Sequence, residues 1–257
     1  GPTGVGKTAT AKALADVYFG AKTRLIRLDM SEYTGEDGVK KLLGSPPGQG
    51  DEKGYLTENI YDNPYSLIVL DEFEKADSKI LDLFLQVFED GRLTDSKGKT
   101  VSFVNSIIIA TSNAASEFIR ENVQKNTAVD KKFKVSLMEF LQTKAIFKPE
   151  LLNRFDDIIV FKPLGQADVV QIIKLLLTEF SKTLLEKDIK ISFEQNVIIK
   201  IANEGFDKEF GARPLRRFIQ DNIEDAIAQK MLKDEIKRGD RIAIVLNGSN
   251  NIALVKN

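Results

Sequence analysis

A phosphate-binding loop opens the sequence and constrains the fold more than any other feature. The first eight residues, Gly1-Pro-Thr-Gly-Val-Gly-Lys7-Thr8, match the pattern Gly-x-x-x-x-Gly-Lys-Thr. Glycines at these positions let backbone N–H groups turn inward around phosphate oxygens. The helix expected over residues 8–19 would present its positive amino-terminal end to the same anion. The motif therefore predicts a nucleotide-binding α/β fold.

The loop also predicts a role for each polar group near the phosphates. Lys7 is expected to reach the β and γ phosphates of ATP, and the Thr8 hydroxyl to ligate Mg2+. A chance match to this pattern has a probability on the order of one per cent, which disfavours the alternative of a Gly-rich turn before an ordinary helix. The predicted ATP-binding residues of the loop are Gly1, Pro2, Thr3, Gly4, Val5, Gly6, Lys7 and Thr8.

A second motif supplies the carboxylates that nucleotide hydrolysis requires. The apolar run that begins at Ser66 ends in Asp71 and Glu72. It predicts a buried strand with both acids at its carboxyl end, where ligands bind in open α/β sheets. We assign Asp71, together with Thr8, to the Mg2+ shell and to ATP binding, and Glu72 to the attacking water. The alternative, a solvated acidic turn, has about one chance in ten for such a pair alone and less beside a phosphate-binding loop.

Short aliphatic runs separated by helical patterns predict a parallel sheet. Strands are expected within residues 24–30, 66–71, 105–111 and 157–161. A phosphate-binding loop is entered from a strand, and no residue precedes Gly1, so we expect a central strand to be absent from this sequence. A polypeptide of these residues alone is expected to fold poorly. Cooperative thermal unfolding with normal ATP affinity would contradict that expectation.

The composition excludes several classes of protein and site. Lys and Arg number 37 against 38 Asp and Glu, a net charge of −1 that lacks the basic excess of a nucleic-acid-binding surface. The chain has neither Cys nor His, so disulfides and thiolate metal sites are excluded and acid–base chemistry would rest on carboxylates. No apolar run is long enough to cross a bilayer. We expect a soluble, cytoplasmic protein with no nucleic-acid or membrane partner.

Seven motifs follow one another over nearly the whole chain. They are Leu28-Asp-Met-Ser-Glu-Tyr33, Gly44-Ser-Pro-Pro-Gly48, Leu70-Asp-Glu-Phe-Glu-Lys75, Gly91-Arg-Leu-Thr-Asp95, Thr111-Ser-Asn113, Leu151-Leu-Asn-Arg-Phe155 and Gly211-Ala-Arg-Pro-Leu-Arg216. In this order they resemble the AAA+ Clp unfoldases and disaggregases, most closely the second ATPase module of a ClpB-type chaperone. The resemblance implies an AAA+ P-loop three-layer sandwich with a parallel sheet over residues 1–163. It also implies a small, mostly helical lid domain with a β-hairpin over residues 164–257.

The same resemblance implies three further catalytic residues. Asn113 would be sensor 1, which helps to hold the attacking water and the γ phosphate with an amide that can donate and accept. Arg154 would be the arginine finger, which reaches the nucleotide held by a neighbouring subunit. Arg213 would be sensor 2, which reaches the γ phosphate from the small domain. Arg216 and Arg217 are interpreted as solvated charges.

Apolar periodicity supports the expected lid domain. Helical stripes run over residues 169–184 and 219–231 and are interpreted as core. Residues 242–246 and 252–255, joined by Asn-Gly-Ser-Asn, predict a closing β-hairpin. A hinge between the two domains is expected at residues 163–165.

The chain departs from the family where its relatives grip substrate. There, Pro-Pro-Gly is followed by an aromatic residue that projects into the pore of the ring. Here Pro46-Pro-Gly48 continues as Gln49-Gly-Asp-Glu-Lys-Gly54 without an aromatic residue, and Tyr55 lies where the next helix is expected to begin. Either the grip differs or a few mobile residues between Gly48 and Gln49 are omitted, and we favour the omission. A chain break there would confirm it, and continuous backbone would contradict it.

A second departure concerns partners. Clp proteins that feed a protease carry an aliphatic residue followed by Gly-Phe, and residues 116–147 lack that tripeptide. The resemblance therefore favours a stand-alone disaggregase, a hexameric ring of identical chains that threads unfolded or aggregated proteins, with a co-chaperone as a further candidate partner. The alternatives are an unfoldase that feeds a Clp-type protease and a nucleotide-gated assembly module without threading. Stimulation of ATPase activity by an unfolded protein would separate threading from assembly.

Overall fold

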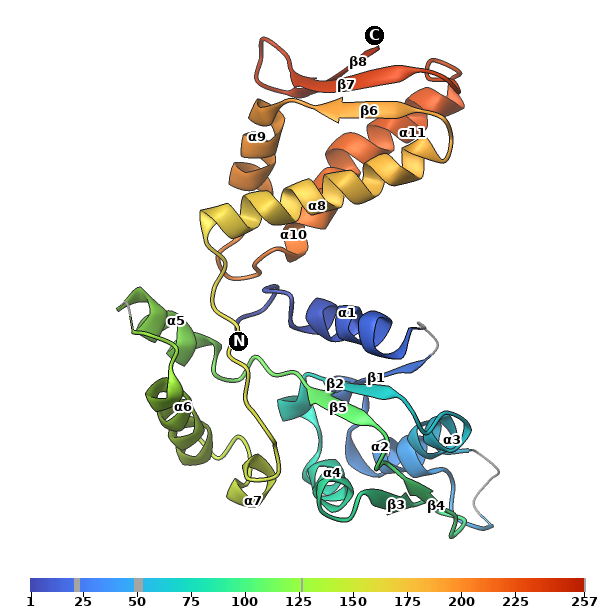
Figure 1. Ribbon diagram of the computed structural model, residues 1–257, viewed down its shortest axis with the longest axis vertical. Coiled ribbons are helices and arrows are strands. Elements are labelled where there is room, and N and C mark those ends of the chain that lie inside the picture. Colours follow the sequence, from blue (N-terminus) through green and yellow to red (C-terminus); the bar gives the residue numbers. More distant parts are fainter. Residues whose placement is uncertain (21–23, 49–52, 126, 257) are drawn as a thin grey trace. The chain divides into compact units, whose positions relative to one another are not determined.

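The computed structural model describes residues 1–20, 24–48, 53–125 and 127–256, which form two compact units (Figure 1). Unit 1 comprises Gly1 and Gly6–Lys162, and unit 2 comprises Pro2–Val5 and Pro163–Asn257. The described helices of unit 1 are α1 (Lys7–Phe19), α2 (Gly35–Leu43), α3 (Tyr55–Asp62), α4 (Ser78–Asp90), α5 (Ser116–Gln124), α6 (Lys131–Thr143) and α7 (Pro149–Leu152), with the 3-10 turns η2 (Met30–Glu32) and η3 (Phe73–Lys75). Its described strands are β1 (Leu25–Asp29), β2 (Leu67–Asp71), β3 (Arg92–Thr94), β4 (Thr100–Ser102) and β5 (Ile107–Ala110).

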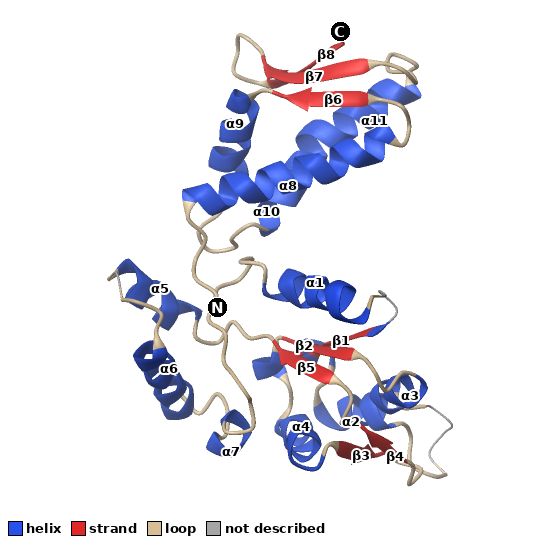
Figure 2. Cartoon of the chain, viewed as in Figure 1, coloured by secondary structure: helices blue, strands red, loops and turns tan. Residues whose placement is uncertain are grey.

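Unit 1 is built on a parallel sheet in the order β1-β2-β5. The middle strand, β2, is fully buried over residues 67–70, as expected for a strand that is covered on both faces. On one face, Leu67 and Val69 pack against two alanines of α1. On the other face, Ile68 and Leu70 belong to the main core, which α2, α3 and α4 cover (Figure 2). The layers are helix, sheet and helix, which confirms the predicted three-layer α/β fold.

Three of the four predicted strands are confirmed as β1, β2 and β5. The prediction of a strand over residues 157–161 is wrong, because this segment forms no ladder with any described strand. Its apolar run has another cause: Ile158 and Val160 pack against the main core, whereas Ile159 is 74% exposed. The segment leads past Gly1, where a Cβ would lie 2.7 Å from the Phe161 carbonyl oxygen. A short apolar run alone therefore indicates burial and does not identify a ladder partner.

The predicted pore loop lies partly outside the described residues. Gln49 and the Gly48–Gln49 junction belong to the part of the chain that is not described, so the proposed omission stays a prediction. Tyr55 is the first residue of α3 and is 47% exposed. The expectation that the next helix begins at this point is therefore confirmed.

Unit 2 combines a helical layer with a small sheet (Figure 1). Its described elements are α8 (Gln166–Leu185), β6 (Lys190–Phe193), α9 (Gln195–Gly205), α10 (Arg213–Ile219), the π-helical turn η4 (Gln220–Glu224), α11 (Asp225–Leu232), β7 (Arg241–Leu246) and β8 (Ile252–Lys256). β7 and β8 are antiparallel, which confirms the predicted hairpin. β6 pairs parallel to β7 and was not predicted. At the start of α8, the Asp168 carboxylate accepts a hydrogen bond from the Gly165 N–H at 2.9 Å.

The second apolar stripe of unit 2 runs through an irregular helix. Ile219, Ile223 and Ile227 are each at most 2% exposed, so their predicted place in the core is confirmed. A spacing of four exceeds the 3.6 residues of an α-helical turn, and successive side chains would drift around the axis of a regular helix. The π-helical turn η4 holds more residues per turn and brings the three side chains back to one face.

In unit 2, Gly211 packs against the segment Pro2–Val5 with no space for a side chain. Its φ is +64°, and a Cβ would lie 2.6 Å from the Thr3 carbonyl oxygen. The next residue, Ala212, donates its N–H to the Gly4 carbonyl at 3.0 Å. This backbone contact holds the tip of the phosphate-binding loop against the turn that precedes α10.

The substitution Gly211→Ala is expected to lower the free energy of unfolding by about 2–4 kcal/mol. A left-handed backbone costs alanine about 1–2 kcal/mol, and the collision with Thr3 adds a comparable amount. Gly239→Ala is the matched control, because Gly239 has a φ of +90° but no atom within 4 Å of a Cβ. Urea unfolding of both variants measures the difference. Equal losses would contradict the tight contact at Gly211.

Candidate functional site: a phosphate and metal site at the end of β2

Asp71 is the centre of a hydrogen-bond cluster at the carboxyl edge of the sheet. The Thr8 hydroxyl, in the first turn of α1, lies 3.1 Å from both carboxylate oxygens of Asp71. The Thr111 hydroxyl, just after β5, donates to Oδ1, and Arg27 Nη2, on β1, donates to Oδ2 at 2.6 Å. Three neighbouring elements thus converge on the carboxylate of a residue that is only 8% exposed.

These contacts determine the charge of Asp71. Burial alone would raise the pKa of its carboxyl, but hydrogen bonds from Thr111, Arg27 and Thr8 and the positive charge of Arg27 outweigh burial. The pKa of Asp71 therefore lies below its ordinary value of 3.8, and the group is ionised at neutral pH.

The contribution of Asp71 to stability is expected to depend on pH. A carboxyl whose pKa is lowered by folding stabilises the folded state above its unfolded pKa, and this contribution is lost as the pH falls through the folded pKa. The loss of unfolding free energy in Asp71→Asn should therefore be largest near neutral pH and shrink below about pH 3.8. Urea unfolding of both proteins from neutral to acidic pH measures the change. A difference independent of pH would show that the charge of Asp71 is not what stabilises the fold.

The oxygen donors around Asp71 suit Mg2+. Thr8 Oγ1 and the Asp71 carboxylate are close enough to share one ion, and Mg2+ prefers such oxygens while it keeps waters and phosphate ligands. No group of three or more His, Cys, Asp or Glu side chains in the described part of the chain could hold a metal. This donor set fits an ion that arrives with a nucleotide.

The ammonium group of Lys7 contacts the first residue of the phosphate-binding motif. Its Nζ donates to the Gly1 carbonyl at 2.6 Å. Gly4 and Gly6 have φ values of +71° and +102°, which residues other than glycine rarely adopt. The ammonium group of Lys7 and the left-handed glycines are features that phosphate-binding loops use to attract anions.

Lys7→Met is expected to weaken ATP binding by about 10- to 100-fold, because it removes charge-assisted hydrogen bonds of about 1.5–3 kcal/mol. Lys12→Met is the matched control, since Lys12 is an exposed lysine of the same helix. The Lys12→Met variant is expected to bind ATP normally. Titration calorimetry with ATP measures both affinities. Equal affinities of the two variants would exclude Lys7 from phosphate binding.

The residues after Asp71 form a strained turn over a buried aromatic cluster. Glu72 has a left-handed backbone with φ 54° and ψ 46°, which is unfavourable for a residue with a side chain. Phe73 anchors the turn, with its ring centroid 5.7 Å from that of Phe147 and 6.4 Å from that of Phe155. Strain at this point is consistent with a functional position for Glu72.

Asn113 is held by its backbone beside the same turn. Its N–H donates to Glu74 Oε1 at 3.3 Å, and its carbonyl accepts from the Ser116 hydroxyl. Glu74 Oε2 is buried and has no hydrogen-bond partner among the described residues. The sensor role predicted for Asn113 thus concerns a residue whose backbone, at least, is fixed.

The two predicted arginines have no described contact with this cluster. Arg154 follows α7 and pairs with Glu89 of α4 at 2.6 Å, with both side chains about half exposed. None of the described contacts joins Arg154 to Thr8 or Asp71. Arg213 is the exposed first residue of α10 in unit 2. The structure brings Lys7, Thr8 and Asp71 to one edge of unit 1, and the roles of all these residues stay predictions.

Two side chains of the cluster were not predicted. Arg27 is the lone charged residue inside the apolar run of β1, which is the signal that could have identified it. Thr111 ends the β5 run, but a threonine there is equally typical of an ordinary strand. Neither signal reveals the partner, because the contact depends on which strands are neighbours in the sheet.

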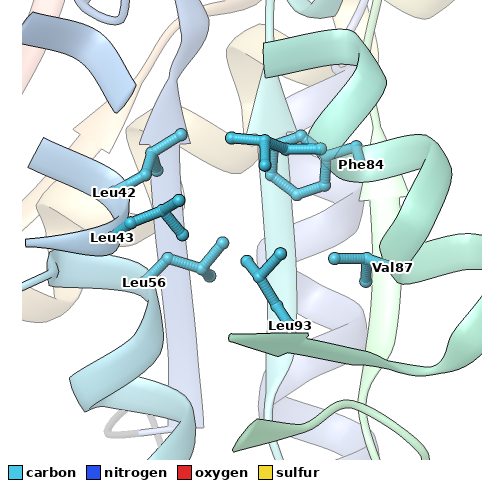
Figure 3. A pocket seen from close by; sticks show the side chains of 7 residues that line it. Leu42, Leu43, Leu56, Phe84, Val87 and Leu93 are labelled. Carbon is cyan, nitrogen blue, oxygen red and sulfur yellow. The ribbon is translucent and has the colours of Figure 1, made fainter. Parts of the chain in front are cut away.

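A second candidate site, an apolar space in the main core, does not fit a ligand (Figure 3). It has no room for a water molecule and no polar lining. The residues that line it are Leu42, Leu43, Leu56, Leu83, Phe84, Val87 and Leu93. It is a packing gap between α2, α3, α4 and β3.

Two family models match consecutive parts of the chain. The model described as "AAA domain (Cdc48 subfamily)" matches residues 1–158, more than half of the chain, including the whole cluster around Asp71. The chain belongs to the AAA domain family. In this AAA chain, a second model, "C-terminal, D2-small domain, of ClpB protein", matches residues 164–244, which contain Arg213.

Curated relatives of the AAA chain are bacterial chaperones. Chaperone protein ClpB of Oceanobacillus iheyensis is 44% identical over 263 residues, which cover 99% of this chain and 32% of that protein. The ClpB chaperones of Staphylococcus aureus and Staphylococcus epidermidis are 44% identical over 254 residues, which cover 98% of this chain and 29% of each. The predicted resemblance to the ClpB-type module is confirmed. The AAA chain spans about a third of the length of these relatives.

Among the described residues of the AAA chain, no helix is both long enough and apolar enough to cross a membrane.

Proposed function

We propose that this chain is an ATP-hydrolysing motor module of a chaperone that assembles into a hexameric ring and unfolds or disaggregates proteins by threading. One observation carries the proposal: Thr8 Oγ1 lies 3.1 Å from the buried, ionised Asp71 carboxylate, at the edge of the sheet where Lys7 follows a phosphate-binding loop. The ClpB names of the relatives support the chaperone part. Unfolded or aggregated proteins, identical subunits and a co-chaperone are the proposed partners, in the cytoplasm.

In this proposal each side chain has a separate task. Thr8 and Asp71 would hold Mg2+, which would neutralise phosphate charge when it is bound with ATP. Lys7 and the loop N–H groups bind the β and γ phosphates. Glu72 orients the attacking water and accepts its proton, and Asn113 holds that water from the segment that follows β5.

The two arginines connect hydrolysis to movement. Arg154 reaches the nucleotide of the adjacent subunit, so hydrolysis depends on ring contacts. Arg213 reaches the γ phosphate from the small domain, so that loss of this phosphate releases a domain contact. Both arginines are exposed in the single chain, which leaves them available for such contacts.

The test of the function is ATP hydrolysis by the intact protein that contains this chain, with and without a permanently unfolded polypeptide. Stimulation by the polypeptide supports threading. Hydrolysis without stimulation would favour a nucleotide-gated assembly module, and absence of hydrolysis would contradict the motor. Stimulation of a Clp-type peptidase would instead favour the unfoldase that feeds a protease.

A further inference from the structure

We propose that Arg27 is a stand-in cation for Mg2+: its guanidinium neutralises the Asp71 carboxylate before a magnesium nucleotide binds and competes with the ion afterwards. The inference rests on the proposed function, since it concerns the metal part of the same site. It makes Arg27 a positioning residue that determines how strongly nucleotide binding depends on Mg2+.

The sheet register explains how Arg27 reaches Asp71. In the β1–β2 pair, Arg27 lies opposite Val69, and Asp29 lies opposite Asp71. Residues two apart in a strand face the same side, so Arg27 and Asp71 share one face of the sheet and lie on a diagonal. The neighbours of Arg27 in β1, Ile26 and Leu28, face the opposite side and are buried in the main core. The backbone of Arg27 is therefore fixed, and its side chain extends along the sheet to Asp71.

The contacts of Asp71 place the two cations in competition. Arg27 Nη2 lies 2.6 Å from Oδ2, and Thr8 Oγ1 lies 3.1 Å from the same oxygen. An ion shared by Thr8 and Asp71 would thus come close to the guanidinium, and like charges at this range repel each other. The Asp71 side chain is only 12% exposed, so water screens the repulsion weakly.

Arg27 has the freedom that an exchange requires. Its side chain is 45% exposed, although its partner is almost buried. The guanidinium can therefore leave Asp71 for water when the ion arrives, at the cost of one partly exposed ion pair. Without either cation, the buried carboxylate would be left with hydroxyl partners only, which is unfavourable for a charge.

Three roles for Arg27 give different results in one experiment. A stand-in weakens Mg2+ binding, so its removal should strengthen the dependence of nucleotide affinity on Mg2+. A residue that only stabilises the fold would leave this dependence unchanged. A phosphate ligand would lower nucleotide affinity equally with and without Mg2+.

The experiment measures ADP affinity of the intact protein by calorimetry, once with saturating Mg2+ and once with excess EDTA. The ratio of interest is the dissociation constant in EDTA divided by the dissociation constant in Mg2+. This ratio is expected to rise about fivefold in Arg27→Gln, the factor that corresponds to one partly exposed charge contact. Arg27→Lys keeps the charge and is expected to keep a ratio near that of the wild type. Lys148→Gln is the matched control, because it removes a 2.6 Å ion pair with Asp82 on α4 and leaves the ratio unchanged.

A second measurement tests the neutralising role without nucleotide. In EDTA, the thermal midpoint of Arg27→Gln is expected to fall below that of the wild type. Addition of Mg2+ and ADP is expected to raise the midpoint of the variant by more than it raises that of the wild type. An unchanged ratio, or an equal loss of ADP affinity with and without Mg2+, would overturn the inference about Arg27. In either case, ADP binding by the wild type would still support the proposed function. Absence of ADP binding in the wild type would overturn both.

Discussion

Replacing Glu72 with glutamine is expected to lower the turnover number for ATP hydrolysis by ~10²–10⁴-fold and to leave ATP affinity near its wild-type value. Glutamine has the shape of glutamate but cannot accept the proton of the attacking water. Glu72 directly follows Asp71, and successive residues of a strand face opposite sides of the sheet. The left-handed backbone of Glu72 ends this alternation, so both acids can serve one site.

The substitution separates chemistry from binding and from stability. Glu72→Gln retains the strained backbone and removes no described hydrogen bond, so its unfolding free energy should match that of the wild type. Glu36→Gln makes the same chemical change at a carboxylate that is 82% exposed and should hydrolyse ATP normally. Single-turnover hydrolysis and ATP titration of both variants give the two constants. Near wild-type turnover of Glu72→Gln would remove Glu72 from the mechanism.

The strands of the parallel sheet were predictable where an apolar run in the sequence marks a buried segment. The aliphatic run of β2 is buried on both faces, as a covered central strand of a parallel sheet requires, and β1 and β5 flank it. The segment 157–161 has the same composition but no ladder partner, and a partner cannot be inferred from the segment itself. β6 was missed for the related reason that a strand of four residues acquires its identity from β7. Local pattern thus predicts burial, and pairing is decided by the rest of the chain.

The residues of the candidate site also fall into those that local motifs predict and those whose contacts depend on the rest of the fold. The motif spacings predict Thr8 and Asp71 as ligands of one ion, and in the structure their oxygens lie 3.1 Å apart. Arg27 could not be assigned, because its contact with Asp71 follows from the order of β1 and β2 in the sheet. Arg154, in contrast, was predicted from its motif, but the structure of one chain does not contain its proposed target. Its proposed target belongs to another subunit, so a single chain contains its resting partner, Glu89, and not its site of action.

Arg154→Ala is expected to lower ATP hydrolysis by about 10³-fold or more without weakening ATP binding, since an arginine finger stabilises charge that develops only in the transition state. The lost ion pair with Glu89 cannot account for such an effect, because partly exposed pairs contribute about 1 kcal/mol or less to stability. Glu89→Ala is the matched control, as it breaks the same 2.6 Å contact and leaves Arg154 in place. Comparable losses of hydrolysis in both variants would mean that the pair, and not the free guanidinium, matters.

Mixing two inactive variants tests whether Arg154 acts between subunits. Glu72→Gln chains retain Arg154, and Arg154→Ala chains retain Glu72, so neither variant alone can form a complete site. In mixed rings, some interfaces place an intact Arg154 beside the nucleotide of a neighbour with an intact Glu72. Hydrolysis is therefore expected to reappear on mixing and to be greatest near equal proportions. A finger that acted on the nucleotide of its own chain would give no recovery at any proportion, because every chain would still lack one of the two groups.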